Sequence, residues 1–133
     1  MAVFAFRCKI KIMKKFAKSV KFALQGIKEL GVNDRNFRIM LAIAFMAVIL
    51  SFYFPLTKTE RIIVFMLIFL VLAFEALNSM IERLLDFLHP HQEKRVGHIK
   101  DIAAGAVFLI SLCALIAGLI IFSPYILPLV LKL

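Results

Sequence analysis

The sequence predicts an all-α membrane protein, a single domain over residues 1–133 in which an amphipathic interfacial helix precedes three transmembrane helices. Of the 133 residues, 63% are hydrophobic and the mean hydropathy is +0.98, whereas soluble domains are roughly 45–50% apolar. Three long apolar segments also approach the roughly 20 residues that a helix needs to cross the hydrocarbon core. The same composition, with 14 phenylalanines, excludes an intrinsically disordered chain.

The amphipathic helix is predicted over residues 14–31. Apolar residues recur there at three- and four-residue spacing, and lysines fill much of the remaining surface. Such a helix lies in the membrane interface, where each lysine gains roughly 1 kcal/mol from anionic headgroups. A solvated basic tail is the alternative, and Met13 competes with Met1 as the start of the chain. The apolar positions are Phe16, Val20, Leu24, Ile27 and Leu30.

The transmembrane helices are predicted over residues 37–54, 62–88 and 102–123. The first holds a single charge near its start. The second opens with thirteen uncharged residues and continues into a polar segment of good helix propensity. The third contains no charge, and we expect Pro124 and then Pro128 to end it.

The distribution of basic residues predicts the orientation of the chain. Nine Lys and Arg residues precede the first span, two lie between the first and second spans, and three lie between the second and third. Because Lys and Arg accumulate on the cytoplasmic side, we expect the amino terminus inside and the carboxyl terminus outside. The polar end of the second span then meets the start of the third at the cytoplasmic face.

Polar residues near the end of the second span share one helix face. At about 100° per residue, Glu75, Asn78, Ser79, Glu82 and Asp86 form one stripe. Glu75 follows the uncharged run, and an ionised group inside a membrane costs about 2.5–3.5 kcal/mol. Such a stripe can hold a hard cation, supply a general base, or both. The alternatives are ion pairs with a neighbouring helix and, for Asp86 above all, simple exposure to solvent.

Lys100 and Asp101 open the third span on the same side of the membrane. A lysine beside the free N–H groups of a helix amino terminus suits phosphate binding, and Asp101 fits equally well as the N-cap. Soluble nucleotide-binding motifs are absent, since Gly26 and Gly31 have the Walker A spacing without the following Lys and Ser or Thr. The basic segments lack nucleic-acid-binding motifs, so we expect no nucleic acid as a partner.

The segments EALNSMIERLLD and KDIAAGAV resemble the signature of the small prokaryotic lipid kinases, the diacylglycerol kinase and undecaprenol kinase family. That pattern runs E-x-L-N-[ST]-x-I-E-x-x-x-D and then K-D-x-[AG]-[AS], and the resemblance extends from Lys14 to Phe122. It implies a homotrimer of three-span subunits in the bacterial cytoplasmic (inner) membrane. It also implies an enzyme that uses Mg²⁺ and ATP to phosphorylate the hydroxyl of a lipid alcohol at the cytoplasmic face.

Matched residue by residue, the resemblance makes Glu75 the general base and makes Glu82 and Asp34 ligands of the nucleotide-bound magnesium. Asp34 stands where the family has a glutamate, and its side chain is shorter by one methylene, about 1.5 Å, so either the backbone shifts or the metal is held through water. Lys15 falls where the family has an arginine near the substrate. The implied nucleotide-binding residues are Lys15, Asn78, Asp86, Lys100 and Asp101, and the implied substrate-binding residues are Lys15, Glu75 and Ser79.

Two questions stay open at this level. The segments KKFAKSV, DRNF and AGLIIF resemble the undecaprenol branch more than the diacylglycerol branch, although the spans suit either acceptor. The alternative function is a non-catalytic small oligomeric membrane protein, such as a cation-conducting or scaffolding subunit. A pore would need a polar stripe across the whole bilayer, and residues 62–74 provide none.

Overall fold

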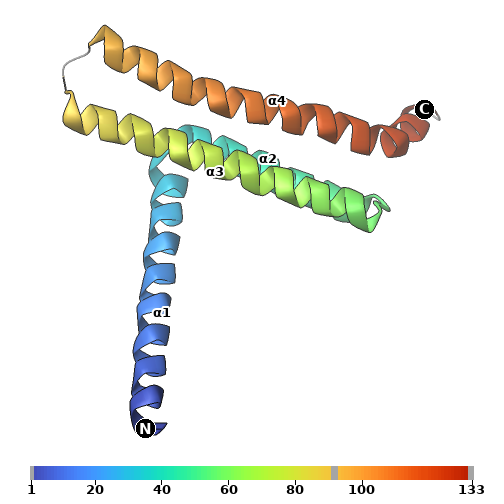
Figure 1. The fold of residues 1–133 in the computed structure, drawn as a ribbon. Coiled ribbons are helices and arrows are strands. Elements are labelled where there is room, and N and C mark those ends of the chain that lie inside the picture. Colours follow the sequence, from blue (N-terminus) through green and yellow to red (C-terminus); the bar gives the residue numbers. More distant parts are fainter. Residues whose placement is uncertain (1, 91–92, 132–133) are drawn as a thin grey trace.

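The computed structural model describes residues 2–90 and 93–131 and consists there of four α-helices. Helices α2, α3 and α4 lie side by side in an up-and-down arrangement, and α1 extends away from them crosswise (Figure 1). Each of the three bundled helices is long and apolar enough to cross a membrane. The predicted all-helical fold with three apolar spans is therefore confirmed. The helices are α1 (Ala2–Asn33), α2 (Arg35–Tyr53), α3 (Lys58–Leu88) and α4 (Lys94–Val130).

Side-chain caps set the beginnings of α2 and α3. Asp34 is the N-cap of α2, and its Oδ1 accepts a hydrogen bond from the backbone N–H of Phe37 at 3.0 Å. Thr57 caps α3 in a capping box, in which Glu60 Oε2 accepts from the backbone N–H of Thr57 at 2.8 Å. Because these contacts satisfy backbone N–H groups that have no partner within the helix, α3 begins before the apolar run and four residues earlier than predicted.

Helix α4 continues through both prolines, so the prediction that Pro124 and Pro128 end it is wrong. Proline lacks the N–H that would bond to the carbonyl four residues earlier, which frees the carbonyl of Ile120 opposite Pro124. The Ser123 hydroxyl donates to that carbonyl at 3.1 Å. A neighbouring serine is one of the ways in which an apolar helix tolerates proline.

The amino-terminal end of α4 also lies outside the predicted limits. Glu93 is its N-cap position, so the prediction that Asp101 caps the helix is wrong, and Lys100 lies in the second turn rather than at the terminus. Hydropathy marks only the apolar part of α4, so the predicted start at residue 102 was too late. The segment from Lys94 to Lys100 is hydrophilic, but its residues still favour a helix. Val96, buried at 9% exposure, anchors this added segment.

A small apolar core closes the end of the bundle where α2 connects to α3. Leu56 and Val64 pack there with Ile121 of α4, and Phe54 and Tyr125 pack against them. The Tyr125 hydroxyl also donates to Glu60 Oε2 at 3.1 Å, which links α4 to the capped start of α3. These contacts fix the lengthwise alignment of α3 with α4.

Large apolar side chains cover the outer faces of the three bundled helices. Phe45 on α2 is 67% exposed, Phe69 on α3 is 70% exposed, and Leu109 on α4 is 67% exposed. An apolar surface this extensive is not stable in water, whereas hydrocarbon chains solvate it favourably. The outer surface of the bundle therefore agrees with insertion in a bilayer.

Candidate functional site

The polar face of α3 points into the helix bundle. Glu75, Asn78 and Ser79 are only 3%, 6% and 2% exposed, although they follow the most apolar part of the helix. Glu82 is half-buried, and Asp86 at the end of the stripe is exposed. The stripe is therefore an interior feature over most of its length rather than the solvated end of a helix.

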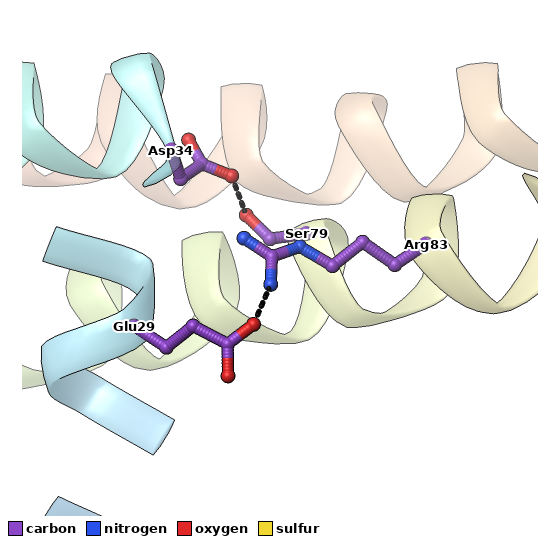
Figure 2. A network of polar contacts seen from close by, with 4 residues as sticks. All are labelled: Glu29, Asp34, Ser79 and Arg83. Atoms are coloured by element: carbon purple, nitrogen blue, oxygen red, sulfur yellow. Dashed lines mark hydrogen bonds and ion pairs between the residues drawn. The ribbon is translucent and has the colours of Figure 1, made fainter. Parts of the chain in front are cut away.

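Asp34 brings the junction between α1 and α2 against this face. The Ser79 hydroxyl donates to Asp34 Oδ2 at 2.6 Å (Figure 2), while Oδ1 of the same carboxylate caps α2. One side chain thus starts a helix and links it to the middle of the polar stripe. Phe37, 4% exposed, buries the first turn of α2 beside this contact.

The environment of Asp34 favours its charged form. Burial by itself would raise the pKa of Asp34, but hydrogen bonds from the Phe37 backbone N–H, the Ser79 hydroxyl and the Asn36 backbone N–H, together with the charge of Arg83, outweigh that effect. The pKa of Asp34 therefore lies below its ordinary value. At neutral pH the group is a carboxylate, which is the form that binds a cation.

Two further carboxylates lie near enough to Glu75 for their charges to act on it. The charges of Asp34 and Glu82 both act on Glu75, so residues far apart in the sequence come together at this point. Within the described residues, however, the structure has no group of three or more His, Cys, Asp or Glu side chains arranged to hold a metal ion. A cation here would rest on no more than two of these carboxylates.

Asn78 contributes an oxygen that has no partner. Its Nδ2 donates to Glu82 Oε1 at 3.0 Å, whereas its Oδ1 is buried and accepts no hydrogen bond from the part of the chain that the structure describes. Such an acceptor costs about 1–3 kcal/mol unless a ligand supplies a donor or a cation. Mg²⁺ takes hard oxygen ligands and is usually bound through one or two carboxylates plus substrate phosphates. Asp34, Glu82 and Asn78 fit that donor set.

At the other end of the stripe, Asp86 forms an ion pair with Lys100 of α4. The pair borders an open cavity of about 450 Å³ between the end of α3 and the start of α4, to which His89, Glu93 and Lys94 also contribute. The structure thus brings together two of the residues predicted to bind the nucleotide. Asp101 follows Lys100 directly and is exposed.

Lys15 lies far from these groups within one chain. It is exposed on α1, nineteen residues before Asp34 (34 − 15), which is about 28 Å along a helix. Helix α1 runs away from the bundle over this distance (Figure 1). A single chain therefore does not bring Lys15 to Glu75.

An ion pair near the site joins two residues that the sequence analysis did not single out. Arg83 Nη1 lies 2.7 Å from Glu29 Oε1 (Figure 2), and this pair connects the end of α1 to α3. The available signal was that Glu29 is the one acidic residue between positions 1 and 33. Its partner could not be chosen without the angle between the two helices.

The sequence has relatives of known activity. A profile described as "Prokaryotic diacylglycerol kinase" matches residues 21–122. The chain is 35% identical over 112 residues to the undecaprenol kinase of Bacillus subtilis (strain 168), which covers 84% of this chain and 91% of that protein. It is 35% identical over 95 residues to the diacylglycerol kinase of Haemophilus influenzae, covering 71% and 80% of the two chains. Its identity to the diacylglycerol kinase of Escherichia coli K12 is 24% over 104 residues, covering 78% and 85%.

These matches extend over most of the chain, and the profile match at residues 21–122 includes the polar stripe of α3 and most of α4. The predicted resemblance is confirmed. The chain belongs to the prokaryotic diacylglycerol kinase family, a family of membrane lipid kinases.

Proposed function

We propose that the protein transfers the γ-phosphate of Mg-ATP to the hydroxyl of a membrane lipid alcohol at the cytoplasmic face of the inner membrane. The observation that carries this proposal is the burial of Glu75 at 3% exposure within an apolar helix, beside Asp34 and Glu82. A lipid hydroxyl resides at the depth of the headgroups, and a soluble nucleotide approaches from the cytoplasm. A polar stripe that starts within an apolar helix and ends exposed at Asp86 can bring the two together.

Glu75 is the general base in this proposal. Its carboxylate accepts the proton of the acceptor hydroxyl as that oxygen attacks the γ-phosphorus. Ser79, one turn along the same face, helps to hold the acceptor, and its bond to Asp34 fixes its orientation. The surrounding helices keep bulk water away from the carboxylate, which limits hydrolysis of ATP in place of transfer.

Asp34 and Glu82 would hold the magnesium, and Asn78 Oδ1 would supply a further oxygen on the same side. When bound, the metal neutralises charge on the phosphates during transfer. Lys100 binds phosphate oxygens once it exchanges its partner Asp86 for the nucleotide. Asp86 then lines the nucleotide site from the α3 side of the open cavity. Asp101 lies outside the cavity lining, and its proposed contact with the nucleotide rests on its position directly after Lys100.

For the acceptor we propose undecaprenol rather than diacylglycerol. Support comes from the undecaprenol kinase relative, whose match extends over 84% of this chain, compared with 71% for the diacylglycerol kinase of equal identity. The apolar faces of the three spans suit both lipids. A direct comparison of the two acceptors is therefore required.

We further propose that α1 lies along the cytoplasmic surface, that the carboxyl terminus lies outside, and that the protein is a homotrimer. The crosswise course of α1 supports the first of these points (Figure 1), and the basic residues around it favour contact with anionic lipid. A substrate-binding role for Lys15 then depends on a movement of α1 or on a neighbouring subunit, because its own chain leaves it far from Glu75.

The proposal is tested with purified protein in mixed micelles that contain either lipid alcohol and radiolabelled ATP. We expect Glu75→Gln to lower phosphate transfer by at least about a hundredfold, within the usual range for losing a general base. Glu60→Gln is the matched control, because Glu60 is a glutamate of the same helix at its other end, and it should retain activity. Substantial activity in Glu75→Gln would remove Glu75 as the base. Absence of transfer to both lipids by the wild type would favour the non-catalytic alternative.

A further inference from the structure

Ser111, in the middle of α4, has a buried hydroxyl that the proposed mechanism does not yet use. Its Oγ is exposed by less than 1 Å² and has no hydrogen-bond partner within residues 2–90 and 93–131. Two other serines in the bundled helices donate to carbonyls of their own helix, Ser51 to Val48 at 2.8 Å and Ser123 to Ile120 at 3.1 Å. A buried hydroxyl without a partner is unfavourable. We therefore expect the Ser111 hydroxyl to gain a hydrogen-bond partner when nucleotide and lipid are bound.

The alignment of α3 with α4 places Ser111 level with Glu75. Asp86 and Lys100 form an ion pair across the two helices. Glu75 lies eleven residues before Asp86 (86 − 75) and Ser111 lies eleven residues after Lys100 (111 − 100). Because the two helices run in opposite directions, both eleven-residue steps lead toward the end of the bundle where α2 connects to α3. Each step covers about 16.5 Å.

The contact at the other end of the two helices gives the same alignment independently. Tyr125 donates to Glu60. Fifteen residues separate Glu60 from Glu75, and fourteen separate Ser111 from Tyr125. The two counts differ by one residue, which is about 1.5 Å of rise. The depth of Ser111 therefore matches that of Glu75 within one residue from either end.

The faces of the two helices agree as well. Eleven residues correspond to about three turns plus 20°. Glu75 therefore lies on nearly the same face of α3 as Asp86, and Ser111 lies on nearly the same face of α4 as Lys100. Val107 on α4 is 8% exposed and lies about 40° from Ser111 on the same side of the helix. Packed helices are roughly 8–10 Å apart, a separation that a glutamate and a serine on facing sides can bridge.

We propose that Ser111 is a positioning residue for Glu75: when nucleotide and lipid are bound, the Glu75 carboxylate accepts the hydrogen bond that the Ser111 hydroxyl does not make in this structure. This inference rests on the proposed function, in which the acceptor proton moves to Glu75. The acceptor oxygen bonds to the γ-phosphorus while the bond from that phosphorus to the β–γ bridging oxygen breaks, and ADP leaves. Ser111 keeps its own proton throughout and holds the orientation of the carboxylate. The motif KDIAAGAV ends at Val107, so Ser111 lies outside the signature.

A pair of variants of equal shape tests this role. Thr and Val have nearly the same volume, but only Thr keeps the hydroxyl. In the mixed-micelle assay we expect Ser111→Val to lower kcat about tenfold or more, the usual effect of losing a hydrogen bond to a charged group, with an unchanged KM for ATP. Ser111→Thr should stay within about twofold of wild type. Ser123→Val, near the outer end of the same helix, is the control and should leave kcat unchanged.

Equal loss of activity in Ser111→Thr and Ser111→Val would indicate a steric role and overturn the proposal. Wild-type kcat in Ser111→Val would overturn it too, while leaving the proposed function intact. Glu75→Gln supplies the cross-check, because Ser111→Val should cause no further loss in that background. A wild-type protein that phosphorylates neither lipid would instead defeat the proposed function, and this inference with it.

A second measurement tests the alignment without enzymatic activity. In a background with Cys8 and Cys113 replaced by Ala, Glu75→Cys combined with Ser111→Cys should form a disulfide within one chain under mild oxidation. Glu75→Cys combined with Leu112→Cys should not, because Leu112 is 41% exposed and points about 100° away. Peptide mapping by mass spectrometry identifies the linked peptides. Because a disulfide needs Cα atoms within about 7 Å, failure of the first pair to link would refute the facing arrangement.

Discussion

Asp34 accepts hydrogen bonds with both oxygens of one carboxylate, and this explains why an aspartate is suited to its position. Oδ1 caps α2 by accepting from Phe37, and Oδ2 accepts from Ser79. Aspartate is among the strongest N-cap residues, and its short side chain keeps the cap and the contact with α3 within reach of the same backbone position. Each carboxylate oxygen has a second lone pair, so these bonds leave room for a cation.

Two substitutions at Asp34 separate its structural role from metal binding. Asn caps helices about as well as Asp, and its Nδ2 can donate to the Ser79 hydroxyl where Asp34 Oδ2 accepts from it, but it carries no charge. We therefore expect Asp34→Asn to raise the Mg²⁺ concentration needed for half-maximal activity with little change in unfolding free energy. Asp34→Ala should raise the Mg²⁺ requirement similarly and also lower stability by about 1 kcal/mol. Magnesium titrations and unfolding in mixed micelles measure the two effects, and an unchanged Mg²⁺ requirement in both variants would exclude Asp34 as a ligand.

At the scale of the helices, two polar contacts fix the end of α1 and the start of α2 against α3. Ser79 with Asp34 lies inside the bundle, whereas Arg83 with Glu29 lies one turn further along, with side chains 43% and 60% exposed (Figure 2). The first contact sets the position of a candidate metal ligand. The second sets where α1 leaves the bundle, and its side chains lie at the surface of the structure.

Exposure predicts that the Glu29–Arg83 pair contributes little to stability. Exposed ion pairs are worth about 0.2–1 kcal/mol and weaken with salt. In a double-mutant cycle of Glu29→Gln and Arg83→Gln, we expect a coupling energy in this range at low salt that falls towards zero at about 1 M salt. Arg38→Gln, an exposed arginine on α2, is the control that should not couple with Glu29→Gln. A coupling well above 1 kcal/mol that resists salt would show that the pair is buried in the membrane-bound protein.

At the scale of the whole molecule, the parts that the sequence predicted are those with a local physical cause. Hydropathy identified the three spans, and the helical period placed Glu75, Asn78 and Ser79 on one face that the structure buries. The ends of α4 were missed because helix propensity continues beyond the apolar segment at Lys94, and because Ser123 compensates for Pro124. The contacts of Asp34 with Ser79 and of Glu29 with Arg83 depend on how the α1–α2 junction meets α3, which no local pattern encodes.

The orientation of the whole chain is the remaining prediction, and single cysteines can test it. Nine basic residues precede the first predicted span, whereas two lie between the first and second predicted spans, so we expect the connection between α2 and α3 to lie outside the cell. In a background with Cys8 and Cys113 replaced by Ala, a membrane-impermeant maleimide should label Lys58→Cys in intact spheroplasts. The same reagent should label Lys94→Cys, at the opposite end of the bundle, only after lysis. The reverse pattern would place Glu82, Asp86 and Lys100 away from cytoplasmic ATP, and the proposed kinase mechanism could not then operate.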